Sequence, residues 1–193
     1  NSSNDSFMLL KDLKKETAEF FMKAPDNNIL EYVLSKKVIL VEGDAEFILM
    51  QEFFELITMK KPEELDVHII SVDGTSFKRY LEISKILKIK TAVIRDNDGD
   101  RNEMMERYSE YRNDENIKIF IDSNNELTTF EIAIYNENKK ICDDLFLEGR
   151  RTLSVQEYML KNKADCAFKL LDATKEDLVS PKYIREAIKW IKE

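Results

Sequence analysis

Two short apolar runs rich in β-branched residues, each ending abruptly at acidic residues, constrain the fold of this chain more than any other feature. The runs cover residues 37–41 and 91–95, and they have the length and composition of buried parallel strands. Side chains at the carboxyl ends of parallel strands project into one crevice, where converging carboxylates repel each other unless a hard cation neutralises them. The sequence therefore predicts a Mg²⁺ or Mn²⁺ site. Its acidic residues are Glu42, Glu46, Asp96, Asp98 and Asp100.

Strand-like and helix-like segments alternate through the middle of the chain. This alternation is typical of an α/β fold in which helices flank a mainly parallel sheet. A further helix with a Thr cap is expected to begin near Thr129. The predicted strands are 37–41, 67–72, 91–95 and 117–121, and the predicted helices are 7–22, 45–57, 77–87, 103–111, 155–171 and 181–191. The side chains expected to face inward from the helix 45–57 are Phe47, Ile48, Met50, Phe53, Phe54 and Ile57.

Composition limits the class of protein. With 193 residues, of which 43% are hydrophobic and 35% charged, the chain can bury one core and carry a helical appendage. The 4 Gly and 3 Pro argue against collagen-like, low-complexity and turn-rich all-β architectures. Two cysteines without CxxC spacing suggest neither a disulfide framework nor a zinc site, which fits a reducing cytoplasm. No apolar run is long enough for a membrane span, and no signal peptide is recognisable.

The net charge of −8 does not by itself exclude nucleic acid as a partner. Bound divalent ions would offset part of the acidic charge, and basic side chains are grouped elsewhere in the sequence. One such group, Lys78 and Arg79, follows residues 74–76, which are suited to holding a backbone phosphate, although a tight turn after a strand explains them equally well. A solvated helix face is the more common explanation of any single basic group.

Two short motifs carry the candidate chemistry. The E-G-x-x-E motif from Glu42 to Glu46 is weak alone, because a glycine and an acidic residue are ordinary at a strand-to-helix turn. The DNDGD motif that begins at Asp96 is stronger, because alternating carboxylates destabilise the fold by repulsion unless they bind something. It resembles the start of an EF-hand loop, but Gly99 precedes Asp100 and no Glu closes the loop. Calcium sensing is therefore a poor fit.

Together the two motifs resemble the Toprim domain of type II topoisomerases, bacterial primases and several nucleases. Glu42 comes before the D-x-D pair Asp96 and Asp98, which is the order of that family. The wider sequence is similar to the C-terminal nuclease half of the OLD (overcoming lysogenization defect) family endonucleases, with which the Gabija-type defence nucleases are grouped. The segments that carry this similarity, within residues 38–190, are VEGDAE, HIISVDGTSFKRYLEISKILKIKTAVIRDNDGD, TTFE and PKYIREAIKW.

The resemblance implies a two-metal cleavage of DNA phosphodiester bonds in a Toprim, Rossmann-like catalytic domain. Asp96 and Asp98 would hold one Mg²⁺ or Mn²⁺ ion with Glu42, which is also a candidate for acid–base chemistry. Glu46 and Glu131 would serve the second ion. Ca²⁺ would occupy the site without supporting cleavage. The implied metal ligands are Glu42, Glu46, Asp96, Asp98, Glu131 and, in an outer position, Asp100.

The resemblance also implies a lysine near the scissile phosphate, where an ammonium neutralises charge that develops in the transition state. Lys163 is the nearest match to this catalytic lysine, and Lys161 is its rival. DNA contacts are further expected from Lys161, Lys78 and Arg79. A lysine before a helix is equally ordinary surface decoration, and a position behind a Thr cap is sufficient reason for Glu131.

Domains and partners follow from the same resemblance. Residues 1–36 are expected to form a helical lead-in, 37–145 the Toprim catalytic domain and 146–193 a helical C-terminal extension. In the family an ABC-type ATPase domain, which binds ATP, precedes this part. No G-x-x-x-x-G-K-[ST] loop occurs here and the first residue is Asn, so we expect a piece of a longer cytoplasmic protein. The expected partners are DNA, that ATPase domain, further copies of the chain in a homo-oligomer and, for a Gabija-type antiphage protein, a helicase-like protein, with no membrane.

Three other functions stay open. A Toprim-like regulatory or binding module would keep the metal site without catalysis, although it would not need Glu131 and Lys163. A primase or topoisomerase fragment would need a zinc-binding module or a Tyr-bearing winged helix, and neither is visible. A receiver-like phosphatase domain would need an early acidic pair, whereas here Glu42 comes first. The single histidine, His68, lies inside a predicted strand and is expected to be structural.

Overall fold

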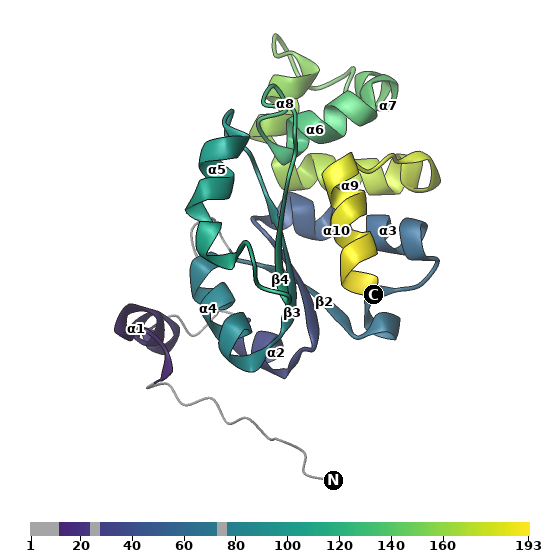
Figure 1. Ribbon diagram of the computed structural model, residues 1–193. Helices are drawn as coiled ribbons and strands as arrows, with labels where there is room; N and C mark the ends of the chain where they lie inside the picture. Colours follow the sequence, from purple (N-terminus) through teal and green to yellow (C-terminus); the bar gives the residue numbers. More distant parts are fainter. Residues whose placement is uncertain (1–11, 24–27, 73–76) are drawn as a thin grey trace.

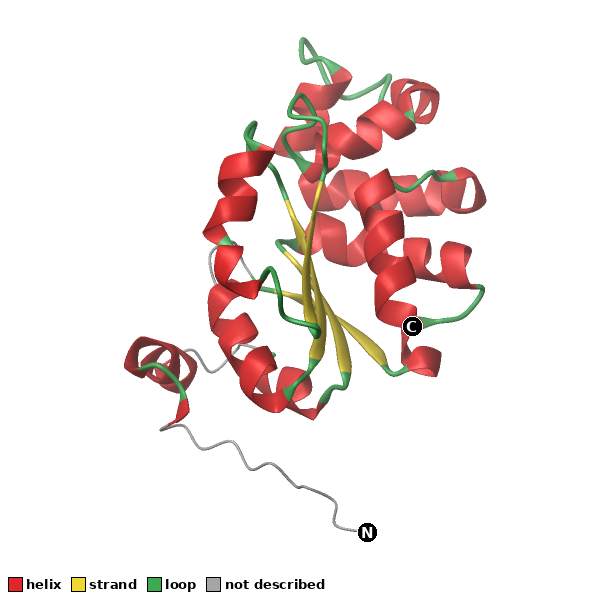
Figure 2. Cartoon of the chain, in the orientation of Figure 1, coloured by secondary structure: helices red, strands yellow, loops and turns green. Residues whose placement is uncertain are grey.

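The fold has three layers, with a parallel sheet between two layers of helices (Figures 1 and 2). The computed structural model describes residues 12–23, 28–72 and 77–193. The predicted α/β class, a mainly parallel sheet flanked by helices, is confirmed. The predicted turn at residues 73–76 and the first part of the predicted helix 7–22 lie outside the described residues.

A sheet of four parallel strands runs through the described part of the chain in the order β2-β1-β3-β4. Short apolar β-branched runs favour such strands because helices cover both faces of the sheet. Each strand agrees with a predicted one to within one residue at either end. The strands are β1 (Lys37–Val41), β2 (Val67–Ser71), β3 (Lys90–Arg95) and β4 (Ile117–Ile121).

Two layers of helices enclose this sheet (Figure 1). The layer on the left of Figure 1, called the α4 side, contains α1 (Lys15–Lys23), α2 (Ile29–Leu34), α4 (Phe77–Leu87) and α5 (Arg101–Arg107). The opposite layer, called the α3 side, contains α3 (Asp44–Thr58), α6 (Phe130–Glu137), α7 (Lys139–Leu145), α8 (Val155–Lys161), α9 (Lys163–Thr174) and α10 (Lys182–Lys192). Short 3-10 helices cover Pro62–Leu65, Ser109–Tyr111 and Lys175–Asp177.

Alternation along the strands divides the apolar side chains between two hydrophobic cores, one on each face of the sheet. In β1, Ile39 and Val41 pack into the core on the α3 side, whereas Val38 and Leu40 pack into the core on the α4 side. The same alternation fixes the direction of the polar residues that follow each strand. It therefore determines which acidic side chains can meet.

Helix α3 buries most of the side chains that its sequence pattern predicts. Met50, Phe53 and Phe54 are fully buried, while Ile48 and Ile57 are partly buried and pack against the same core. The predicted inward orientation of Phe47 is wrong, because this side chain is 36% exposed. The buried stripe runs instead through Ala45 and Leu49, one helical turn apart, and Phe47 projects to its side.

The predicted helix 155–171 is interrupted at Asn162. The Asn162 side-chain amide donates to the carbonyl oxygen of Tyr158 at 2.8 Å, and its backbone N–H bonds to the same oxygen at 3.0 Å. Such local side-chain bonds satisfy the end of a helix and compete with its continuation. Helix α9 consequently starts afresh at Lys163. Likewise, the helix predicted over 103–111 begins earlier, at Arg101, and ends at Arg107, and helices α2 and α7 were not predicted.

The strand order creates a crevice at the carboxyl ends of β1 and β3. These two strands are neighbours, but the helix that follows β1 covers one face of the sheet and the helix before β3 covers the other. In open α/β sheets, ligands bind at such a switch point. Helices α9 and α10, from the predicted C-terminal extension 146–193, pack against α3 and against β1, β3 and β4, so this part of the chain shares the central core.

Candidate metal centre

The carboxylates that follow β1 and β3 meet at this crevice but point to different faces of the sheet. Glu42 continues the series of Val38 and Leu40 on the α4 side, and Arg95, the last residue of β3, points to the same side. Asp96 is one residue later than Arg95 and so points to the α3 side. The predicted site therefore divides into an α3-side group and an α4-side group.

The α3-side group consists of Glu46, Asp96 and Glu131 around the ammonium of Lys163. Glu46 comes from the first turn of α3 and Glu131 from the first turn of α6, and both are buried. The Nζ atom of Lys163 lies 3.1 Å from Oε1 of Glu131. Both carboxylate oxygens of Glu131 are buried. Apart from the ion pair with Lys163, no hydrogen-bond donor among the described residues reaches them. Orphaned buried oxygens of this kind suit a cation.

Burial and mutual repulsion raise the pKa values of two carboxyls in this group. The pKa of Asp96 rises to about 8, chiefly through burial and then through the charges of Glu46, Glu42 and Glu131. The pKa of Glu46 rises to about 7, again mainly through burial. Burial alone would lower the pKa of Lys163, but its acidic neighbours, Glu131 first, raise it. Asp96 and part of Glu46 therefore stay protonated at neutral pH, because one ammonium does not offset three carboxylates that crowd together.

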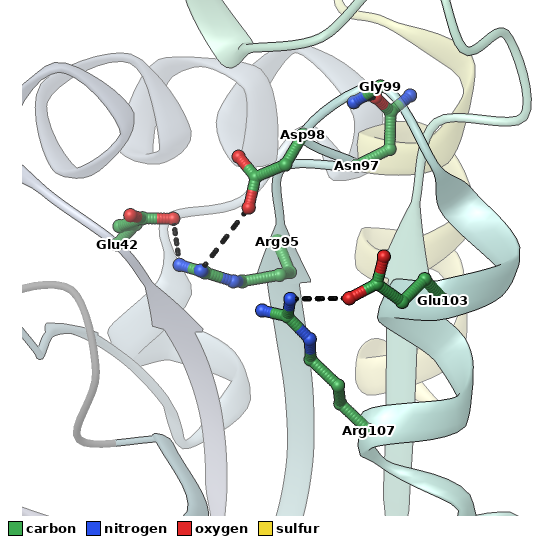
Figure 3. A network of polar contacts seen from close by, with 7 residues as sticks. All are labelled: Glu42, Arg95, Asn97, Asp98, Gly99, Glu103 and Arg107. Carbon is green, nitrogen blue, oxygen red and sulfur yellow. Dashed lines mark hydrogen bonds and ion pairs between the residues drawn. The ribbon is translucent and has the colours of Figure 1, made fainter.

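The α4-side group is built around Arg95 (Figure 3). Its guanidinium forms an ion pair with Glu42, and Nη2 lies 3.8 Å from Oδ2 of Asp98. The guanidinium also lies above the ring of Phe77, 5.5 Å from the ring centre. Sequence reasoning missed Arg95, because a basic residue at a strand end is unremarkable alone. The alternation of β3, which places Arg95 on the same face as Glu42, was the signal that could have identified it.

The acidic loop after β3 is held by Asn97, a second residue that the sequence did not single out. Asn97 is buried, accepts a hydrogen bond from the backbone of Gly99 at 2.9 Å, and donates one to the carbonyl oxygen of Asn124 at 2.8 Å. The loop turns through positive φ values at Asp98 (50°) and Gly99 (88°). Asp100 does not join either group, because its side chain caps α5 by accepting a hydrogen bond from the backbone N–H of Glu103 at 3.0 Å.

The basic residues predicted to bind DNA are separated from the acidic groups. Lys161 is exposed in the last turn of α8. On α4, Lys78 lies 4.0 Å from a carboxylate oxygen of Glu110, and the guanidinium of Arg79 lies 4.0 Å from the ring centre of Phe20. Of the two lysines proposed as catalytic, the structure brings Lys163 into the acidic centre.

His68 has a structural partner, as predicted. Its Nδ1 atom lies 2.9 Å from a carboxylate oxygen of Glu31, at the edge strand β2. His68 pairs in register with Val38, near the start of its strand, whereas the acidic groups lie beyond the carboxyl ends of β1 and β3. The histidine is therefore no part of the candidate centre.

The donor chemistry of the centre fits a hard divalent cation. A cavity of 170 Å³ opens between Glu42, Glu46 and Lys163. Within the described ranges, no three His, Cys, Asp or Glu side chains lie in a ligand arrangement as they stand. Lys163 and Arg95 instead neutralise the carboxylates that would serve as ligands. All-oxygen donors in excess of the positive charge are the preferred environment of Mg²⁺ and Mn²⁺.

Comparison with protein-family models matches residues 33–98 to the TOPRIM domain of proteins like the overcoming lysogenization defect protein. The chain contains an OLD-like Toprim domain. The matched segment runs from α2 to the acidic loop and includes Glu42, Glu46, Asp96 and Asp98. This assignment supports a function of the Toprim type, which includes nucleases, and Toprim domains generally bind divalent metal ions.

Solved structures with the same fold extend the likeness beyond the matched segment. The C-terminal region of the OLD protein of Xanthomonas campestris pv. campestris has a TM-score of 0.59 at 21% identity, over 84% of this chain and 94% of that one. The C-terminal region of the Burkholderia pseudomallei OLD protein has a TM-score of 0.58 at 21% identity, over 82% and 98%. At this identity the likeness shows a shared fold and nothing beyond it. Comparison with curated proteins gave no match. No helix in the described ranges is long and apolar enough to cross a membrane.

Proposed function

We propose that this chain is a metal-dependent DNA endonuclease domain that hydrolyses phosphodiester bonds with two Mg²⁺ or Mn²⁺ ions. The observation that carries the proposal is the buried carboxylate group after β1 and β3, in which the pKa of Asp96 is raised to about 8 by burial and by its acidic neighbours. A protein gains nothing in stability from such crowding of carboxylates, whereas a phosphodiesterase needs a dense carboxylate shell. The OLD-like Toprim assignment agrees with this chemistry.

Asp96 is the residue best suited to serve both cations. Its pKa responds to Glu46 and Glu131 on the α3 side and also to Glu42, so its carboxyl neighbours both groups. Glu46 and Glu131 would complete one metal site, and Glu42 and Asp98 the other. When bound, paired divalent ions lower the pKa of a water and stabilise the leaving oxygen. Ca²⁺ would fill the same sites without supporting cleavage.

Lys163 is proposed to act on the substrate phosphate. Its ammonium is partly exposed beside the cavity at Glu42 and Glu46, and it forms an ion pair with Glu131. A cation entering at Glu131 would free the ammonium to neutralise charge that develops on the phosphate. Glu42, at the mouth of the same cavity, is the candidate proton acceptor for the attacking water.

We also propose that this domain works together with other domains and partner proteins. The two solved relatives are C-terminal regions of OLD proteins, and the chain spans nearly their whole length. We infer that an ABC-type ATPase domain of the same polypeptide supplies ATP-dependent control. A role in antiphage defence, a helicase-like partner of the Gabija type and a homo-oligomer are supported by the sequence resemblance alone.

Incubation of the protein with supercoiled plasmid and Mn²⁺ tests the activity. We expect nicked and then linear DNA, no product with a chelator, and no product from the variants E42A, D96A and D98A with their fold intact by circular dichroism. D144A, which alters an exposed carboxylate of α7, is the control that should cut normally. Intact plasmid in the presence of bound Mn²⁺ would instead favour a metal-binding module without catalysis.

A further inference from the structure

Strand β4 forms one edge of the sheet, and a groove of 660 Å³ runs along it. Its inner side pairs with β3, from Ile117 beside Thr91 to Ile121 beside Arg95. In the described part of the chain, no strand pairs with its outer side. Alternate residues of an edge strand point their backbone N–H and C=O groups outward, where another extended chain can pair with them.

The two layers of helices form the walls of this groove, with α5 on one side of β4 and α10 on the other (Figure 1). Met105 and Tyr111 line the wall on the α4 side, and Trp190 lines the wall on the α3 side. The side chains of β4 alternate between the walls. Ile119 packs against the core on the α4 side, whereas the ring centre of Phe120 lies 6.0 Å from that of Trp190. The groove thus combines a free backbone edge with apolar surface on both walls.

Four cationic side chains line the groove, and three of them, Arg101, Lys118 and Lys189, form no ion pair with a carboxylate of the described residues. The fourth, Arg112, pairs with a glutamate of α5 at 3.1 Å. Lys118 and Lys189 are exposed. The Nε atom of Arg101 is buried, and no hydrogen-bond acceptor within the described ranges reaches it. A donor in this state means that the guanidinium is not committed to a partner in its own chain.

The two acidic side chains of the groove, Glu186 and Glu193, have cations of their own. A carboxylate oxygen of Glu186 lies 3.8 Å from the ammonium of Lys182, one helical turn earlier. Burial lowers the pKa of Lys90, and the charge of Glu193 opposes this shift, so Glu193 lies near a cation outside the groove. The groove therefore keeps an excess of positive charge on a chain whose net charge is −8. Such a surface attracts an anionic partner.

An extended peptide fits these features better than a strand of nucleic acid. A peptide carries N–H and C=O groups at the spacing of a β-strand and so can pair with the outer edge of β4. A nucleic acid strand would need exposed rings on which its bases stack, whereas Tyr108, Tyr111 and Tyr183 are at most 7% exposed. Alternate side chains of the peptide would face opposite walls. Acidic ones suit the wall with Lys118 and Lys189, and apolar ones suit the other wall.

We propose that β4 and its groove bind an extended acidic segment of a partner protein, which adds a strand to the edge of the sheet. The backbone of this segment pairs with β4, while its carboxylates meet Lys118, Lys189 and Arg101. The inference goes beyond the proposed nuclease function and does not depend on it, because none of these residues belongs to the candidate metal centre.

Fluorescence anisotropy of a labelled peptide of about seven residues, in which Glu alternates with Val, tests the docking, since this length spans β4 at roughly 3.3 Å per residue. We expect saturable binding that the double variant K118Q/K189Q weakens by about fivefold, because two charge pairs are lost. K182Q is the matched control, because Lys182 lies on α10 outside the groove and pairs with Glu186, and its affinity should stay within about twofold of wild type. No binding of the peptide, or equal binding by the double variant with its fold intact by circular dichroism, overturns the proposal.

Two N-methylated forms of the same peptide test the pairing with β4. Methylation of every Glu nitrogen blocks one edge of the extended peptide, and methylation of every Val nitrogen blocks the other. One of the two forms should bind at least about tenfold more weakly than the parent, while the other stays within about threefold. Equal affinities of the two forms would contradict strand addition.

The same assays identify a different occupant. Tighter binding of a labelled oligothymidylate than of the acidic peptide, weakened by K118Q/K189Q, would assign the groove to nucleic acid and overturn the proposal. Sedimentation of the free protein as a dimer that K118Q/K189Q dissociates would assign the groove to a second copy of the chain, with the same consequence.

Discussion

Lys163 and Glu131 form a 3.1 Å ion pair between the first residue of α9 and the first turn of α6. The pair exists because Asn162 ends α8 and lets a new helix begin at Lys163. It brings a lysine from the C-terminal part of the chain into contact with carboxylates that follow the central strands. Neither Lys163 nor Glu131 stands out from its neighbours in the sequence, yet the fold joins them in the same site.

Loss of Lys163 should reduce cleavage much more than loss of Lys161. We expect K163A to lower the rate of plasmid nicking in Mn²⁺ by about 100-fold or more, because an ammonium aimed at developing phosphate charge is removed. K161A, which changes an exposed residue two positions earlier, should stay within about twofold of wild type. Nicking rates at saturating Mn²⁺ make the comparison. A K161A variant as impaired as K163A would contradict the assignment of the catalytic lysine.

The metal-free protein should become less stable as the pH rises from about 5 to about 8. The pKa of Asp96 is about 8 and that of Glu46 about 7 in the folded chain, above the ordinary values of 3.8 and 4.5. The folded state therefore binds more protons than the unfolded state between these limits, so its stability is greatest at low pH and declines upward. Urea unfolding in the presence of a chelator measures the free energy of unfolding at each pH.

D96N provides the variant for that measurement. It should stabilise the metal-free protein at pH 8 by at least about 2 kcal/mol and flatten the pH dependence, because one buried carboxyl no longer ionises. D144N, at an exposed position, should behave like wild type. A wild-type stability that rises between pH 5 and 8 would show that Asp96 is not held in a repulsive group.

Asn97 should contribute more to the free energy of unfolding than most loop residues do. N97A leaves the backbone N–H of Gly99 and the carbonyl oxygen of Asn124 without their buried partner, which we expect to lower the free energy of unfolding by about 2–3 kcal/mol. N125A is the matched control, since Asn125 is exposed and accepts a single hydrogen bond from the backbone of Arg101 at 3.0 Å. Its loss should be at most about 1 kcal/mol. If N97A and N125A lowered the free energy of unfolding equally in urea, Asn97 would not have the structural role assigned to it.

The strands and the strand-end carboxylates were accessible from the sequence because both depend on local patterns. Apolar runs that stop at Glu42 and Asp96 specify strand, strand end and crevice together. Glu131 and Lys163 came from the family resemblance, since their meeting depends on how α6 and α9 pack. Arg95 and Asn97 escaped notice because their roles need the relative position of two loops, which no periodicity encodes. The break at Asn162 was missed because apolar spacing continues through it, while a side-chain bond to Tyr158 ends the helix.

Anomalous diffraction from a crystal soaked in Mn²⁺ tests the central claim most directly. We predict two peaks roughly 4 Å apart, with Asp96 between them, Glu46 and Glu131 around one and Glu42 around the other. Lys163 should have left the carboxylate that it now neutralises. A single peak, or none near Asp96 with Lys163 still on Glu131, would contradict a two-metal nuclease centre at this crevice.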